Sequence, residues 1–139
     1  MAFAEQSLVA IIEDDADAAF LLRRLLQKTQ VPHHVEHLDD GEKALNFLTA
    51  RFDVALHGES PDLILLDIKM PKLNGFEVLQ WIRSQAHLAV PVIVMTTSDD
   101  PSDQQRALDL GADAFVSKFP SATDFRDLVT KLLRANAAA

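Results

Sequence analysis

Residues with acidic, hydroxyl and amino side chains follow four short apolar runs in this sequence. The runs occupy positions 8–12, 63–66, 92–95 and 114–116. The residues directly after them are, in chain order, Glu13, Asp14 and Asp15, then Asp67, then Thr96 and Thr97, and finally Ser117 and Lys118. If the runs are parallel strands of one sheet, their carboxyl ends lie at one edge, where sites form in open α/β sheets. The sequence therefore predicts that these distant side chains meet in one place.

Carboxylates gathered at one edge repel one another, and they then either hold a proton or bind a cation. At about 4 Å and an effective dielectric constant of about 20, the repulsion within one pair is roughly 4 kcal/mol. Oxygen ligands suit a hard divalent ion, and Mg²⁺ needs few protein ligands because it keeps several waters. One carboxylate could then attack phosphorus, while the Lys118 ammonium and the Thr96 hydroxyl stabilise the transferred group. The product of such chemistry is an aspartyl phosphate.

The apolar runs are continuous rather than alternating, which is typical of strands buried on both faces of a parallel sheet. A weaker segment at 35–38 has the pattern of an edge strand. Helical patterns lie between the runs, at 41–50, 75–85 and 101–110, and Gly111 stands where a helix C-terminal cap belongs. Strand and helix alternate about five times, which predicts an α/β fold with right-handed crossovers.

The first and last helical segments each carry an apolar stripe. The stripe of the first consists of Phe20, Leu21, Leu25 and Leu26, and that of the last of Phe125, Leu128, Val129, Leu132 and Leu133. We expect both stripes to face the sheet. The connection at 49–61 is longer than the usual ~4–6 residues, so it either extends a helix or forms a surface loop.

Length and composition narrow the function further. The chain has 139 residues, enough for one domain spanning 1–139, and it has no cysteine, which excludes disulfides, thiolate zinc sites and cysteine nucleophiles. Its net charge of −8 disfavours binding to nucleic acid. The N-terminus lacks the features of a signal peptide, and no apolar stretch approaches the ~20 residues that cross a bilayer. We therefore expect a cytoplasmic protein without a membrane partner.

Four segments in order resemble the receiver domain of two-component response regulators. They are Ile-Ile-Glu-Asp-Asp at 11–15, Leu-Leu-Asp-Ile-Lys-Met-Pro at 65–71, Val-Met-Thr-Thr at 94–97 and Gly-Ala-Asp-Ala-Phe-Val-Ser-Lys at 111–118. The resemblance implies a flavodoxin-like, doubly wound (βα)₅ fold with strand order 2-1-3-4-5. It also implies that a sensor histidine kinase transfers a phosphoryl group to the domain in a reaction dependent on Mg²⁺ or Mn²⁺. A protein-interaction surface of the domain would then change.

The resemblance also implies a role for each site residue. For the metal, it implies a set made up of Glu13, Asp14, Asp67 and the backbone carbonyl of Lys69. For phosphoryl transfer, it implies Asp67 as the phosphoacceptor, with Thr96 and Lys118 as the groups that contact the phosphoryl oxygens. For the conformational switch, it implies the hydroxyl of Thr96 and the ring of Phe115.

Two positions depart from the family pattern. The family usually has proline directly after the lysine, often following a cis peptide bond, whereas Phe119 here separates Lys118 from Pro120. Lys69 would place a cation beside the phosphoryl group, and we expect it to alter the rate of dephosphorylation. The shape of the loop after Lys118 stays open at this point.

The chain continues from Lys118 only to Ala139, enough for one more helix, which suggests a stand-alone regulator. The run Thr-Thr-Ser-Asp-Asp at 96–100, the long connection at 49–61 and the missing Lys-Pro pair are similar to small regulators that serve phytochrome-type histidine kinases. A homodimer through the last helices is also expected from the long apolar stripe, although that stripe could equally be core.

Two other functions are compatible with parts of the same pattern. A phosphohydrolase with an aspartyl nucleophile would place a second Asp two positions after the first, where Lys69 stands. A receiver-like domain that is never phosphorylated is another possibility.

Some of these residues could also have a purely structural role. Asp15 could simply open a helix, where a carboxylate is favoured by the dipole. His33, His34 and His37 fit an exposed strand better than a metal site, because His33 and His37 would lie about 13 Å apart at ~3.3 Å per residue.

Overall fold

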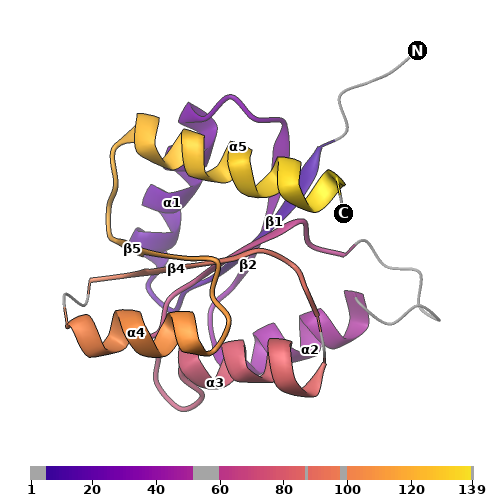
Figure 1. Cartoon of the computed structure of the whole chain (residues 1–139), viewed down its shortest axis with the longest axis vertical. Helices are drawn as coiled ribbons and strands as arrows, with labels where there is room; N and C mark the ends of the chain where they lie inside the picture. Colours follow the sequence, from indigo (N-terminus) through magenta and orange to yellow (C-terminus); the bar gives the residue numbers. More distant parts are fainter. Residues whose placement is uncertain (1–5, 52–59, 87, 98–99, 139) are drawn as a thin grey trace.

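A five-stranded parallel sheet with helices on both faces carries the residues singled out above (Figure 1). The structure is a computed structural model that describes residues 6–51, 60–86, 88–97 and 100–138. The strands are β1 (Ser7–Ile12), β2 (His33–Leu38), β3 (Leu63–Leu66), β4 (Val92–Thr96) and β5 (Ala114–Ser117). The helices are α1 (Ala16–Lys28), α2 (Gly41–Arg51), α3 (Gly75–Gln80), the π-helical segment η2 (Trp81–Gln85), α4 (Pro101–Asp109) and α5 (Ala122–Ala138). The strand order is β2-β1-β3-β4-β5, so the predicted fold and strand order are confirmed.

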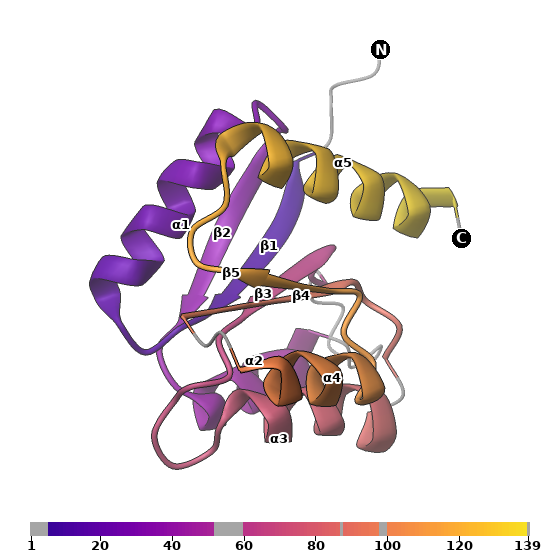
Figure 2. The same ribbon diagram turned by 60° about the vertical axis from the view of Figure 1, so that its left-hand side comes forward.

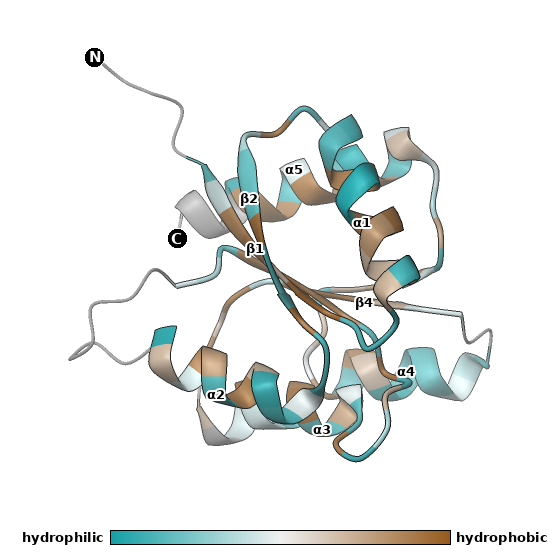
Figure 3. Ribbon diagram, turned by 180° about the vertical axis from the view of Figure 1, so that it is seen from behind, coloured by the Kyte–Doolittle hydropathy of each residue, from teal (hydrophilic) through white to brown (hydrophobic). Residues whose placement is uncertain are grey.

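The helices form two layers around the sheet. Figures 1 and 2 show α1 and α5 on one face and α2, α3 and α4 on the other. Because side chains alternate along a strand, Ile11 of β1 packs with α1 and α5, while Ile12 packs with α2 and α3. The inner strands therefore bury apolar side chains on both faces, which explains why they lack an alternating pattern. Figure 3 colours these strands largely brown, while the edge strand β2 is mostly teal.

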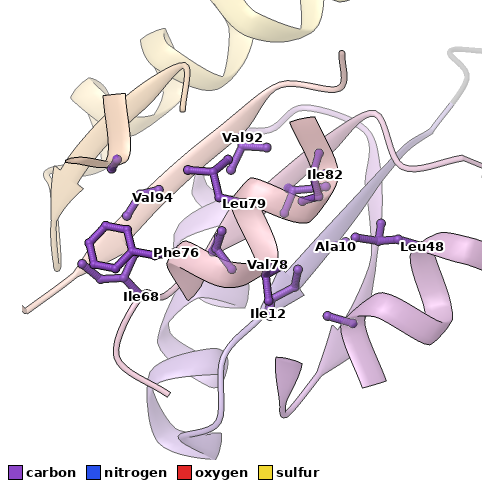
Figure 4. Close-up of a cluster of buried hydrophobic side chains, with 14 of the residues drawn as sticks. Ala10, Ile12, Leu48, Ile68, Phe76, Val78, Leu79, Ile82, Val92 and Val94 are labelled. Atoms are coloured by element: carbon purple, nitrogen blue, oxygen red, sulfur yellow. The ribbon is translucent and has the colours of Figure 1, made fainter. Parts of the chain in front are cut away.

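The core beneath α3 positions the strand that carries Asp67. Phe76 at the start of α3 packs beside Ile68 and Val94, and Leu79 and Ile82 continue the cluster along β4 (Figure 4). Burial of each such side chain contributes roughly 1.5–3 kcal/mol. The end of β3 is therefore held between β1, β4 and the first turn of α3.

The predicted stripe of the first helix is partly wrong. Leu25 and Leu26 are buried as expected, but Phe20 is 56% exposed and Leu21 is 47% exposed. The buried face of α1 consists of Ala18, Ala19, Leu22, Leu25 and Leu26. These positions repeat at three and four residues, so Phe20 and Leu21 fall to the side of that face. In the last helix, by contrast, Phe125 and Val129 are buried as expected.

Several element boundaries also differ from expectation. β2 begins at His33 rather than at position 35, β4 includes Thr96, and β5 includes Ser117. The segment expected as one helix at 75–85 divides into α3 and η2. The connection predicted at 49–61 begins inside α2, which ends at Arg51, and positions 52–59 lie outside the described residues.

Gly111 follows the end of α4 with φ of +106°, as its predicted role in a helix C-terminal cap requires. Within the described ranges, no helix has the length and apolarity needed to cross a membrane.

Candidate functional site

The carboxyl ends of the strands bring the predicted site residues together. Backbone hydrogen bonds continue the sheet by one residue beyond the strand ends: Asp67 N donates to Ile12 O at 3.0 Å, and Lys118 N donates to Thr96 O at 2.9 Å. Glu13 N likewise donates to the last carbonyl of β2, that of Leu38, at 3.0 Å. These hydrogen bonds fix the backbone at each strand end and thereby hold the following site side chains at the edge of the sheet.

Three carboxylates form the centre of the site. Glu13, Asp14 and Asp67 each offer one oxygen, and these oxygens all lie within 4.8 Å of one another. Glu13 and Asp67 are buried, whereas Asp14 is exposed. Such a cluster of oxygen ligands, open on one side, could bind a divalent cation.

Asp15 has a different role from its two acidic neighbours. It is the N-cap of α1, and its side chain accepts hydrogen bonds from Asp17 N at 2.9 Å and Ala18 N at 3.5 Å. The expectation that Asp15 opens a helix is therefore confirmed. The cap fixes the start of α1 directly beside the acidic cluster.

Lys118 supplies the positive charge of the site. Its Nζ forms an ion pair with Glu13 Oε1 and lies 3.4 Å from Asp67 Oδ2. The lysine side chain is only 5% exposed, so the ammonium group is directed inward. The peptide bond between Lys118 and Phe119 is cis, which answers the question that the sequence left open about this loop.

The pKa of Glu13 is raised to about 7, because burial and the charge of Asp67 together outweigh the hydrogen bond and charge of Lys118. The raised pKa means that Glu13 takes up a proton more readily than an ordinary glutamate, which is one of the two outcomes expected for clustered carboxylates.

A close approach of α3 to β3 fixes the orientation of Asp67. A Cβ atom at Gly75 would overlap the carbonyl oxygen of Asp67 and lie 2.5 Å from the Cα of Ile68, so only glycine fits there. Asn74 caps α3 by accepting a hydrogen bond from Glu77 N at 3.1 Å. The backbone N–H of Lys69 donates to Asp67 Oδ1 at 3.1 Å, which leaves Oδ2 directed towards Lys118.

The cluster lies in a hollow of about 380 Å³, called the acidic hollow below. Besides residues predicted from the sequence, its lining includes Leu21, Thr97 and Phe119. Thr97 stands at a predicted strand end but has no role in the predicted site. Leu21 belongs to the apolar stripe predicted for the first helix, and Phe119 enters the prediction only as a departure from the family pattern. The position of Phe119 directly after Lys118 is the signal that could have identified it.

The two predicted switch residues lie deeper than the hollow. Thr96 is fully buried at the end of β4. The next residue, Thr97, is the one that lines the acidic hollow. Phe115 in β5 is half-buried and packs against the core on the side of α2, α3 and α4. Neither side chain is part of the lining of the acidic hollow.

The histidines do not contribute to the acidic cluster in the part of the chain that the structure describes. His34 is exposed, as expected, but His33 and His37 are half-buried. A ring nitrogen of His37 lies 2.7 Å from the carbonyl oxygen of Glu13, and one of His33 lies 2.7 Å from that of Val31. The His33 contact is local, whereas the His37 contact joins β2 to the backbone of Glu13 at the end of β1; both involve backbone carbonyls, which supports the structural interpretation of both residues.

The model of the response regulator receiver domain family matches residues 9–132, a range that includes every residue of the site. The chain belongs to this family. Probable transcriptional regulator ycf27 of Guillardia theta is 36% identical to the chain over 126 residues, which make up 91% of this chain and 45% of that regulator. The receiver domain thus spans less than half the length of this relative.

Solved structures of receiver proteins have the same fold. The crystal structure of the phosphorylated cyanobacterial phytochrome response regulator RcpA matches with a TM-score of 0.75 at 30% identity, over 92% of this chain and 91% of RcpA. The Mn²⁺-bound form of response regulator Rcp1 matches with a TM-score of 0.72 at 28% identity, over 91% of each chain. The structural neighbours of this receiver domain therefore include phytochrome-associated response regulators, in line with the resemblance found in the sequence.

Proposed function

We propose that this chain is a single receiver domain spanning 1–139, which accepts a phosphoryl group on Asp67 as a stand-alone response regulator of a two-component phosphorelay. Receiver domains pair with sensor histidine kinases, and the phytochrome-associated neighbours support a phytochrome-type kinase as the donor. The observation that carries the proposal is the meeting of Asp67, Glu13, Asp14 and Lys118 at one edge of the sheet.

Asp67 is the nucleophile in this proposal. Its carboxylate is oriented by the Lys69 N–H on one oxygen, and its other oxygen lies 3.4 Å from Lys118 Nζ. The ammonium group of Lys118 is therefore positioned to neutralise charge on the phosphoryl oxygens, and phosphoryl transfer depends mainly on such positioning and charge neutralisation. Intrinsic autophosphorylation and slow autodephosphorylation follow from the same groups.

Glu13, Asp14 and Asp67 would hold Mg²⁺ or Mn²⁺, together with the backbone carbonyl of Lys69. Their oxygen donors suit a hard divalent ion, and the pKa of Glu13 is raised chiefly by burial and further by the charge of Asp67. A bound ion would supply positive charge that, together with Lys118, would neutralise charge on the phosphoryl oxygens. The Mn²⁺-bound form of Rcp1 supports the assignment by similarity alone.

Thr96 and Phe115 form the switch in this proposal. Phosphorylation adds negative charge at the end of β3, beside the end of β4, where Thr96 supplies a hydroxyl donor. Movement of Thr96 towards the phosphoryl group would free space behind it for the half-buried ring of Phe115. The change would reach the surface formed by α4 and β5.

A homodimer through the last helices is the proposed form of output. Leu128, Leu132 and Leu133 of α5 are only partly buried, and Leu108 of α4 is 41% exposed. Sedimentation with and without phosphorylation tests this point, because a monomer that persists in both states would exclude output by dimerisation.

One experiment separates the proposed function from its alternatives. The protein is incubated with acetyl phosphate and Mg²⁺ and then weighed intact. We expect a single, slowly hydrolysed phosphoryl adduct that is absent in Asp67→Asn. Sustained release of phosphate without an adduct would indicate a phosphohydrolase, and the absence of any adduct or turnover would indicate a receiver domain that is never phosphorylated.

A further inference from the structure

Two exposed apolar side chains form one wall of the acidic hollow. Leu21 of α1 is 47% exposed and Phe119 is 45% exposed, and both line this hollow. Both also line a neighbouring hollow of about 290 Å³, so the wall continues beyond the site. On a protein with a net charge of −8, an apolar wall beside a carboxylate cluster is unusual, because exposed apolar side chains are normally scattered singly.

The neighbouring surface of the hollow is strongly negative. Asp14, Asp15 and Asp17 are exposed and line the same hollow as the apolar wall. In an in-line transfer to Asp67, the group that leaves phosphorus lies on the far side of phosphorus from the attacking oxygen. Since Asp67 is buried and lines the hollow, the leaving group must depart through the open side of the hollow, called its mouth below, which Asp14, Asp15, Asp17, Leu21 and Phe119 also line.

The chemistry of the mouth discriminates between two kinds of leaving group. A carboxylate that leaves from an acyl phosphate is an anion, so it meets the like charges of the aspartates. An imidazole that leaves from a phosphorylated ring nitrogen is neutral and planar, and it can lie against the aromatic ring of Phe119. The two leaving groups therefore differ in how well they fit this mouth.

We propose that Phe119 and Leu21 determine phosphodonor specificity, by forming a leaving-group subsite that favours donors phosphorylated on an imidazole nitrogen over acyl phosphates. The inference rests on the proposed phosphorylation of Asp67. In the step concerned, a lone pair on a carboxylate oxygen of Asp67 forms the new O–P bond. The N–P bond breaks with its electron pair staying on nitrogen, and imidazole leaves as a neutral ring because its second nitrogen already carries a proton.

Two small donors test the subsite without a partner protein. The rates of adduct formation from phosphoimidazole and from acetyl phosphate are measured with Mg²⁺ by intact mass, and their ratio is compared between variants. The ratio isolates the leaving group, because Lys118 and the metal site act on the phosphoryl group that both donors share. Any disturbance of Lys118 in a Phe119 variant therefore cancels.

We expect Phe119→Ala to lower the ratio of the phosphoimidazole rate to the acetyl phosphate rate by about threefold to tenfold, the range typical of aromatic pairs. Phe119→Leu should keep part of the preference, since it retains an apolar wall without the ring, and Leu21→Ala should lower the ratio less than Phe119→Ala. Phe20→Ala is the matched control, because Phe20 is 56% exposed on the same helix and is not part of the lining of either hollow.

Each other result overturns the inference in a recognisable way. Rates that fall in proportion for both donors would assign Phe119 to the positioning of Lys118 and not to the leaving group. An equal change of the ratio in Phe20→Ala would indicate a general surface effect. If the wild-type protein formed no adduct with either donor, the proposed function itself would fail, whereas an unchanged ratio with normal adduct formation would remove only the subsite.

Discussion

The two ends of the sheet use the same kinds of charged group in opposite ways. At the amino ends of β4 and β5, the charges are matched. Arg83 reaches from η2 and forms an ion pair with Asp113 at 2.9 Å, and Asp113 also accepts a hydrogen bond from Val92 N at 2.8 Å. The other guanidinium hydrogen bonds, of 2.7–3.0 Å, go to the carbonyl oxygens of Leu88, Val90 and Gly111.

At the carboxyl ends, the charges do not match. Among the residues that the structure describes, Lys118 is the cation that pairs with the cluster of Glu13, Asp14 and Asp67. The elevated pKa of Glu13 is the electrostatic consequence, because its burial and the charge of Asp67 outweigh the hydrogen bond from Lys118.

The difference teaches which cluster is structural and which is functional. A cation that donates its hydrogen bonds to backbone carbonyls and one carboxylate stabilises the packing of those elements, and it has few donors left to bind a ligand. A cluster with surplus negative charge keeps capacity for a cation and for the phosphoryl group that the cation would accompany. Removing charge should therefore affect stability at the amino end and chemistry at the carboxyl end.

The largest expected effect is on chemistry at the carboxyl end. Asp14→Asn removes one metal ligand that is exposed, so we expect the rate of phosphorylation by acetyl phosphate to fall by about 100-fold. The free energy of unfolding should change by less than about 1 kcal/mol, as is usual for surface positions. Intact mass spectrometry and urea unfolding measure the two effects. A large loss of stability in this variant would contradict the assignment of surplus charge to function.

Arg83→Met should show the converse pattern at the amino end. Three carbonyl oxygens and the Asp113 carboxylate lose their partner, so we expect the free energy of unfolding to fall by about 2 kcal/mol. Phosphorylation should persist in the folded protein. Arg126→Met is the matched control, since Arg126 forms only an exposed ion pair with Asp127 and should leave stability within about 0.5 kcal/mol. Equal losses in both variants would refute a special role for Arg83.

The carboxyl end of the sheet, with its acidic cluster, was largely predictable from sequence, and the amino end, with its Arg83–Asp113 pair, was not. Asp67 and Lys118 directly follow apolar runs, and a parallel sheet must bring such positions to one edge. Arg83 lies outside the four segments that resemble the family, and Asp113 lies in the fourth of them without an implied role, so their pairing depends on how η2 packs against β4 and β5.

The apolar wall escaped prediction for a different reason. Periodicity places a helical residue relative to the helix axis, but it does not fix which edge of the buried face a neighbouring helix covers. Phe20 and Leu21 were therefore assigned to the core, while the structure leaves both exposed. The side-chain environment of Phe119 likewise depends on the loop after β5, which the sequence pattern left undetermined.

Divalent cations should stabilise the metal-free protein through the carboxyl end alone. At a Mg²⁺ concentration tenfold above its Kd, we expect the free energy of unfolding to rise by about 1.4 kcal/mol, because the folded state alone assembles the site. Thermal unfolding with and without MgCl₂ measures the shift. Asp14→Asn should lose this stabilisation and Arg83→Met should keep it. Stabilisation that survives in Asp14→Asn would place the cation elsewhere.

The smallest expected effect concerns the cation at the rim of the carboxyl end. Lys69 is exposed and lines the acidic hollow, where its ammonium group can pair with phosphoryl oxygens and hinder the approach of water. We therefore expect Lys69→Ala to shorten the lifetime of the phosphoryl group by about threefold, a modest effect because exposed charge pairs contribute little. The decay of the adduct after removal of acetyl phosphate measures this lifetime, with Lys72→Ala as the control on the same exposed loop. Identical lifetimes in wild type and Lys69→Ala would show that Lys118 and the metal ion balance the surplus negative charge without a contribution from Lys69.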